Sequence, residues 1–201
     1  MMQKAPQRSW PSRFILWVLV SLYRLQGWKL IGGPPKERRG VLIGAPHTTN
    51  WDFIFFVGIT DELGIQPGFM GKHSLFKWPF RRFMHELGGV PVVRSSSHNY
   101  VDQMVDEFAR RDDMMLVVAP EGTRKGAAKW KSGFYHIALG AGVPIIPGWL
   151  DYQAKRGGLG PAIMPTGDYA ADMARIAAYY ESVLPGHPRW LAITAGVENS
   201  A

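Results

Sequence analysis

The chain of 201 residues contains no cysteine. This absence excludes disulfide bonds, a thiolate nucleophile and any metal site that depends on cysteine ligands. The histidines His73, His85 and His98 do not stand at metal-ligand spacing from His47. The sequence also lacks the Gly, Lys and Ser/Thr spacing of a Walker loop, and it carries no nucleic-acid-binding motif. We therefore expect neither a metal cofactor nor a nucleic-acid partner.

Long hydrophobic runs are missing as well. The uninterrupted apolar run 14–20 is too short to cross a bilayer, and no small-x-small cleavage site follows it. Basic and aromatic residues lie in or near this run: Arg13, Arg24, Trp10, Trp17 and Trp28. Such a helix could lie in the membrane interface, with its rings at headgroup depth and its basic residues on anionic lipid. The alternative is an ordinary first helix that packs on the core.

Acidic residues are the minority among the charged side chains, with 16 Asp and Glu against 23 Lys and Arg. The formal net charge of +7 favours anionic partners, such as a phospholipid surface, a phosphate ester, a nucleotide or a nucleic acid, although no nucleic-acid-binding motif is present. The length suits one domain that is large enough to bury a hydrophobic core. We divide the chain into an N-terminal interfacial helix with its lead-in, residues 1–31, and an α/β domain, residues 32–201.

Strand-like segments alternate with helical segments along the domain. The expected strands are 28–32, 41–46, 68–72, 90–93, 114–120 and 144–150. After the N-terminal helix, the expected helices are 51–63, 78–87, one that begins near residue 95, 133–140 and 168–183. This alternation predicts a single-domain α/β fold, with a largely parallel sheet flanked by helices and an N-terminal amphipathic helix.

Polar clusters follow four of these strands directly. They are His47, then Lys72 with His73, then Arg94, then Glu121 to Lys125. In open α/β sheets, ligands bind outside the carboxyl ends of the strands. We therefore expect all four clusters to line one crevice.

A histidine and an aspartate stand five residues apart after the strand 41–46. Thr49 or Asn50 can cap the next helix, and Thr49 with Asp52 fits a capping box. On one continuous helix, five residues turn by about 500°, so the two side chains would diverge by roughly 140°. His47 can therefore meet Asp52 only from the turn before the helix, where the carboxylate fixes the histidine tautomer and leaves the other nitrogen as a base. The alternative is a helix cap beside a polar loop residue.

The segment 119–134 is a turn that is rich in basic residues: Arg124, Lys125, Lys129 and Lys131. A glycine-containing loop with several cations suits a phosphate-bearing ligand, because backbone amides and basic side chains can hold it together. Glu121 could accept a hydrogen bond from a substrate hydroxyl, or it could orient Arg124. A solvated run of charge is the usual alternative for such a loop.

Four sequence blocks occur in a fixed order: His47-x-x-x-x-Asp52, Gly89–Arg94, Pro120–Arg124 and Val143–Pro147. Together they resemble the four blocks of the glycerolipid acyltransferase family, which includes the lysophosphatidic acid acyltransferases. The His/Asp block and the Pro-Glu-Gly-Thr-Arg block carry most of this resemblance, which covers the middle of the chain.

The resemblance implies transfer of a fatty acyl group from a coenzyme A or acyl-carrier-protein thioester to a hydroxyl of a lysophospholipid or a glycerol-phosphate-type acceptor. It implies no cofactor beyond this co-substrate. His47 would act as general base and Asp52 would orient it. The implied substrate-binding residues are Lys72, Arg94, Glu121, Gly122, Thr123 and Arg124.

Two other functions remain open from the sequence. One is an acyl thioesterase, in which water replaces the acceptor hydroxyl. The other is a non-catalytic basic module that binds a lipid surface. We expect a cytoplasmic protein that associates peripherally with an anionic membrane surface through its N-terminal helix.

Overall fold

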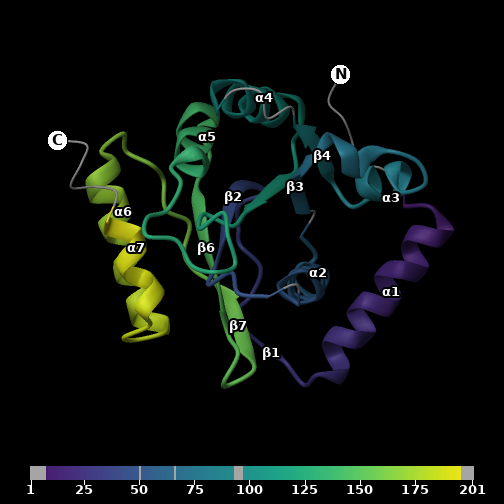
Figure 1. The fold of residues 1–201 in the computed structure, drawn as a ribbon, viewed down its shortest axis with the longest axis horizontal. Coiled ribbons are helices and arrows are strands. Elements are labelled where there is room, and N and C mark those ends of the chain that lie inside the picture. The colour runs from purple at the N-terminus through teal and green to yellow at the C-terminus, as the bar shows by residue number, and fades with distance from the viewer. Residues whose placement is uncertain (1–7, 50, 66, 93–96, 196–201) are drawn as a thin grey trace.

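The computed structural model describes residues 8–49, 51–65, 67–92 and 97–195, and a seven-stranded sheet lies at its centre (Figure 1). The strands are β1 (Lys29–Ile31), β2 (Arg39–Ala45), β3 (Pro67–Lys72), β4 (Gly89–Val92), β5 (Met114–Val118), β6 (Ile145–Asp151) and β7 (Arg156–Leu159). Their spatial order is β1-β7-β6-β2-β5-β3-β4, and neighbours run parallel except for the antiparallel pair β6 and β7. The prediction of a largely parallel sheet flanked by helices is confirmed.

Helices cover both faces of this sheet (Figure 1). They are α1 (Trp10–Leu25), α2 (Asp52–Glu62), α3 (Arg81–Glu86), α4 (Ser97–Arg110), α5 (Gly133–Ala141), α6 (Tyr169–Val183) and α7 (Leu191–Thr194), with short 3-10 helices η1 (His73–Phe76) and η2 (Pro188–Trp190). Helices α4 to α7 share the main core with one face of the sheet, whereas α1 and α2 lie over the other.

The central strand β2 divides its side chains between these two faces. Val41, Ile43 and Ala45 are almost completely buried in the core under α5 and α6. Leu42 and Gly44 point to the opposite face, because successive side chains alternate along a strand. Both residues line a cavity on that side, between the sheet and α2. The core therefore fixes the strand from one side and leaves space on the other.

Helix α1 is tied to the domain at its N-terminal end. Glu86 of α3 accepts hydrogen bonds from the backbone nitrogen and the hydroxyl of Ser9, at 2.9 and 2.6 Å, and Arg82 Nε lies 2.7 Å from the same carboxylate. Burial alone raises the pKa of Glu86, but hydrogen bonds from Ser12, Ser9 and Arg82 outweigh it and lower that pKa to about 2. The ionised carboxylate thus holds the start of α1 against α3.

The structure differs from the sequence-based prediction in several local features. Helix α3 begins at Arg81, three residues later than expected, because the preceding residues form a turn. Strand β7, η2 and α7 were not expected at all. The N-cap of α2 is Trp51 rather than the predicted Thr49, and it makes no side-chain cap hydrogen bond. Asn50 and Arg94 lie outside the described residues, so the arginine after β4 stays a prediction. Among the helices described, none is both long and apolar enough to cross a membrane.

Candidate active site

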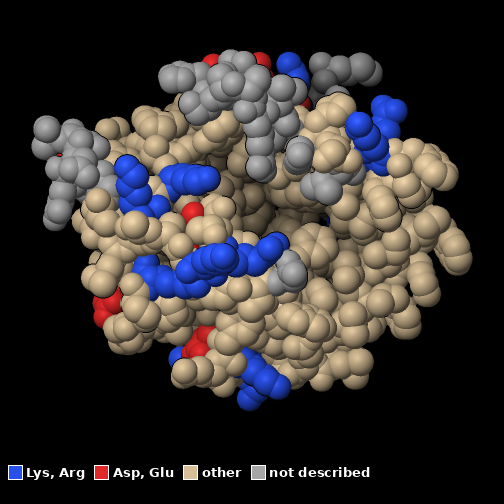
Figure 2. Space-filling model, in the orientation of Figure 1, with Lys and Arg blue, Asp and Glu red and all other residues tan. Residues whose placement is uncertain are grey.

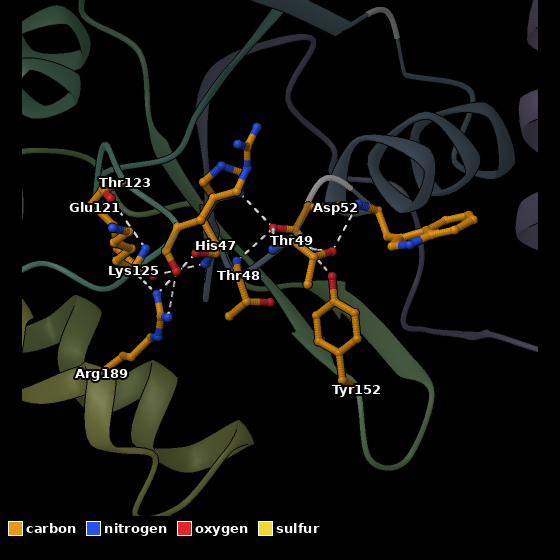
Figure 3. A network of polar contacts seen from close by, with 11 residues as sticks. His47, Thr48, Thr49, Asp52, Glu121, Thr123, Lys125, Tyr152 and Arg189 are labelled. Carbon is orange, nitrogen blue, oxygen red and sulfur yellow. Dashed lines mark hydrogen bonds and ion pairs between the residues drawn. The ribbon is translucent and has the colours of Figure 1, made fainter.

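His47 and Asp52 meet at the carboxyl end of β2 (Figure 3). His47 lies in the turn after the strand, Asp52 is the first residue of α2, and His47 Nδ1 stands 2.7 Å from Asp52 Oδ2. This is the arrangement that the five-residue spacing required, with the histidine outside the helix. The contact uses Nδ1 and leaves Nε2 of the imidazole without a bond to Asp52.

Asp52 also caps the turn that carries the histidine. Its Oδ2 accepts hydrogen bonds from the backbone nitrogens of Thr48 and Thr49, at 2.8 and 3.1 Å, and Tyr152 donates its hydroxyl to Oδ1. Burial raises the pKa of Asp52, but the hydrogen bonds from His47, Tyr152 and the two amides outweigh it, so the net pKa is lowered. The same carboxylate therefore orients the histidine and binds the turn before α2, whereas the N-cap of that helix is Trp51, without a side-chain cap hydrogen bond.

Glu121 and Arg189 fix the other side of the same turn. Glu121 is buried, and its Oε1 accepts a hydrogen bond of 3.0 Å from the backbone nitrogen of His47. Arg189, from η2 near the C-terminus, pairs with the Glu121 carboxylate and donates to the carbonyl oxygens of His47 and Arg124, at 3.1 and 2.9 Å. Three distant segments are therefore joined around the histidine. The carboxylate of Glu121 has protein partners on both oxygens.

The basic loop after β5 lies beside this network. Arg124, Lys125, Lys129 and Lys131 are all exposed. Gly122 has a φ of 65°, in the left-handed region that favours glycine, and a Cβ there would come within 2.8 Å of the Lys131 side chain. In Figure 2, Lys and Arg side chains gather next to a hollow in this face of the molecule. Fixed positive charge beside a hollow suits an anionic ligand.

An apolar cavity of ≈ 470 Å³ opens at the histidine and lies between α2 and the sheet. Its wall includes His47, Asp52 and Arg124 at the carboxyl edge of the sheet and continues along α2 as far as Leu63. From Asp52 to Leu63 the helix advances about 16 Å. Most of the remaining wall is aliphatic or aromatic. The volume is within the range of small-molecule sites, and the lining suits a hydrocarbon chain.

The other predicted site residues have different positions. Thr123 is exposed and its Oγ1 accepts a hydrogen bond of 3.3 Å from the backbone nitrogen of Lys125. The backbone of Lys72 ends β3, so this residue stands at the same edge of the sheet as His47. Arg94 lies outside the described residues. Among the residues described, no cluster of three or more potential metal ligands is present, and the absence of a cofactor stays a prediction.

Tyr152 and Arg189 were missed by the sequence analysis. Tyr152 follows the last residue of β6, so the rule that placed His47 and Glu121 at the carboxyl edge also applies to it. Arg189 has no comparable signal, because it lies in a short helix after the last predicted one.

Comparison with known proteins adds an independent observation. A family model described as Acyltransferase matches residues 33–151, more than half of the chain. The chain belongs to the Acyltransferase family. The match includes His47, Asp52 and the Glu121–Arg124 segment, and it confirms the resemblance drawn from the four sequence blocks.

Individual members of the family are moderately similar in sequence. The chain is 32% identical over 139 residues to a 1-acyl-sn-glycerol-3-phosphate acyltransferase of Haemophilus influenzae, covering 63% of this chain and 55% of that protein. The protein of the same name from Escherichia coli is 33% identical over 110 residues, covering 51% and 43%. The chain thus spans about half the length of the curated relatives it matches.

A solved structure shares the fold. The crystal structure of the 1-acyl-sn-glycerophosphate (LPA) acyltransferase from Thermotoga maritima matches with a TM-score of 0.57 and 19% sequence identity. The match covers 94% of this chain and 80% of that one. The similarity therefore extends beyond the region of the family model and includes most of the helices on both faces of the sheet.

Proposed function

We propose that this acyltransferase-family protein transfers a fatty acyl group from a coenzyme A or acyl-carrier-protein thioester to the hydroxyl of a lysophosphatidic-acid-type acceptor. The observation that carries the proposal is the position of the histidine. A histidine bonded to a carboxylate lies where an apolar cavity opens next to a basic loop. The cavity suits the acyl chain, the loop suits a phosphate, and the imidazole lies between them.

The reaction follows from the state of this pair. With Asp52 ionised and accepting the Nδ1 proton of His47, the lone pair of the neutral imidazole is on Nε2. Nε2 takes the proton of the acceptor hydroxyl while the oxygen attacks the thioester carbonyl carbon. The carbon–sulfur bond then breaks, and the thiolate takes the proton back from the imidazolium. Asp52 stabilises the imidazolium while it exists, and no acyl-enzyme is formed.

The basic loop would hold the phosphate of the acceptor. Arg124 reaches the cavity wall beside His47, and guanidinium groups bind phosphate with two parallel hydrogen bonds. Lys72, Arg94, Gly122 and Thr123 are proposed to take part because they follow neighbouring strands at this edge or lie in the same turn. For Glu121 the hydrogen bonds support a positioning role, because its carboxylate already holds His47 and Arg189.

The proposal is tested by product identification. Purified protein is incubated with a long-chain acyl-coenzyme A or acyl-carrier protein and with lysophosphatidic acid, and lipids are analysed by mass spectrometry. We expect phosphatidic acid with at least one of the two donors. If neither donor yields an acylated lipid and free fatty acid accumulates, the protein is a thioesterase. If neither product forms, the proposed transfer is wrong.

We also propose that the protein associates peripherally with an anionic membrane surface through α1. The buried face of this helix includes Leu16 and Val20, whereas Trp10, Phe14 and Trp17 are 78%, 54% and 65% exposed. The three exposed rings stack along the helix, with centroids 6.3 and 6.0 Å apart. Aromatic side chains flanked by arginine suit the headgroup region of a bilayer. The helix would thus pack on the domain and meet lipid with opposite faces.

Substitution of the three exposed rings tests this association. A Trp10→Ser, Phe14→Ser, Trp17→Ser variant should bind vesicles of phosphatidylglycerol and phosphatidylcholine at least tenfold more weakly, since burying one such ring contributes about 1.5–3 kcal/mol. Cosedimentation measures the binding. Leu191→Ser is the matched control, because Leu191 is 78% exposed on α7, on the other side of the molecule (Figure 1). Unchanged affinity in the triple variant would mean that the basic loops alone hold the membrane.

A further inference from the structure

The two oxygens of Asp52 have unequal sets of partners. Oδ2 faces His47 Nδ1 and the backbone nitrogens of Thr48 and Thr49, at distances between 2.7 and 3.1 Å. Oδ1 has the hydroxyl of Tyr152 and, at 3.5 Å, the hydroxyl of Thr49. Tyr152 is therefore the main partner of Oδ1. Among the described residues, it is also the one hydrogen-bond partner of this carboxylate from outside the segment 47–52.

Tyr152 is held firmly by its surroundings. It follows β6 in the tight connection to β7, where Asp151 accepts hydrogen bonds from the backbone nitrogens of Gln153 and Ala154, at 3.1 and 3.0 Å. Its ring packs edge-on against Trp28 and Phe55, with centroids 5.3 and 5.6 Å apart. A fixed ring gives its hydroxyl a fixed position, which is what a support for a catalytic group requires.

The protonated phenol of Tyr152 is a hydrogen-bond donor, and the ionised carboxylate of Asp52 is an acceptor. Burial and the hydrogen bond to Asp52 raise the pKa of Tyr152, so the phenol keeps its proton at neutral pH. Asp52 keeps its carboxylate ionised, as described above. The phenol therefore always donates and the carboxylate always accepts, and the direction of the hydrogen bond does not change over the working pH range.

We propose that Tyr152 is a positioning residue for the base, because its hydroxyl fixes Oδ1 of Asp52 and so turns Oδ2 towards Nδ1 of His47. The inference rests on the proposed acyl transfer. Tyr152 lies one residue beyond the segment that the family model matches, 33–151. Tyr152 after β6 thus contacts Asp52 at the start of α2, and Asp52 contacts His47 in the turn after β2.

Loss of this hydroxyl would affect the base in a specific way. Without Tyr152, Oδ1 keeps one long contact, and the partly buried carboxylate can turn to find another donor. Each such rotation moves Oδ2 away from Nδ1 and loosens the imidazole. The effect should be largest in the transition state, where the imidazolium forms and needs the carboxylate most.

Steady-state kinetics of Tyr152→Phe test the inference. The phenyl ring keeps the packing on Trp28 and Phe55, so we expect KM for the acyl donor and the acceptor to stay the same. We expect kcat to fall about tenfold, because the loss of one hydrogen bond to a charged group typically has an effect of that size. The matched control is Tyr23→Phe. The Tyr23 hydroxyl donates to Glu62 at 3.0 Å, so this variant loses a similar tyrosine–carboxylate bond away from the histidine and should keep kcat.

A double-mutant cycle separates positioning from other effects. If Tyr152 acts through Asp52, Tyr152→Phe should change nothing further in the Asp52→Ala background. An equal tenfold fall in both backgrounds would overturn the inference, and so would an unchanged kcat in Tyr152→Phe alone. A wild type that forms no acylated lipid refutes the acyl transfer itself. An active wild type with an unaffected Tyr152→Phe variant overturns the role of Tyr152 only.

Discussion

Substitution of His47 by alanine should lower acyl transfer about a thousandfold, since removal of a general base typically costs 10²–10⁴ in rate. The imidazole lies at the cavity, and its Nε2 can take the acceptor proton while Nδ1 is held by Asp52. Its side chain is only partly buried, so the variant should fold. The release of thiol from a long-chain acyl-coenzyme A in the presence of lysophosphatidic acid measures the effect.

The matched control for this variant is His136→Ala. His136 is an exposed histidine on α5, on the face of the sheet away from the cavity. It should keep wild-type activity, and both variants should keep the wild-type circular dichroism spectrum and melting temperature. A His47→Ala protein that is folded and fully active would show that another group takes the proton.

A larger side chain at position 44 should shorten the acyl chain that the protein accepts. Gly44 lines the cavity, and a Cβ at this position would meet no heavy atom within 4 Å, so an added side chain would extend into the space. Each methylene excluded from an apolar site costs about 0.8 kcal/mol. Exclusion of two or three methylenes by Gly44→Leu should therefore lower kcat/KM for a palmitoyl donor roughly thirtyfold.

The donor series provides the control for Gly44→Leu. An octanoyl donor should lose much less activity in the variant than a palmitoyl donor, because it has fewer methylenes to place in the narrowed cavity. Gly44→Ala adds a single carbon and should give an intermediate profile. Gly148 is a poorer position for the same test, since a Cβ there would lie 3.0 Å from Leu42. Equal losses with short and long donors would mean that the acyl chain does not occupy this cavity.

Much of the architecture could be predicted because its signals are local. The six predicted strands are short apolar runs that border glycine or proline residues, and β2 and β5 are near their predicted bounds. The rule for carboxyl ends then placed His47 and Glu121 at one edge, and the structure joins them through a hydrogen bond of 3.0 Å. The angular argument also located His47 in the turn. These inferences needed only residue spacing and strand direction.

The rest depended on contacts between segments far apart in the chain. Tyr152 reaches Asp52 across 100 residues, and Arg189 reaches His47 across 142. No local pattern carries such information, because it arises from the order of strands in the sheet and from the path of the C-terminal helices. Strand β7 was missed for a related reason. Its short, glycine-containing sequence at 156–159 shows no alternation, and pairing with β1 and β6 creates it.

The ratio of free thiol to acylated lipid tests the central claim most directly. Wild type and His47→Ala are incubated with palmitoyl-coenzyme A, with and without lysophosphatidic acid, and both products are counted. The account predicts one thiol for each phosphatidic acid, little thiol without the acceptor, and neither product above background with His47→Ala. Thiol release at the same rate with and without the acceptor would contradict acyl transfer, and thiol release by His47→Ala would contradict the histidine base.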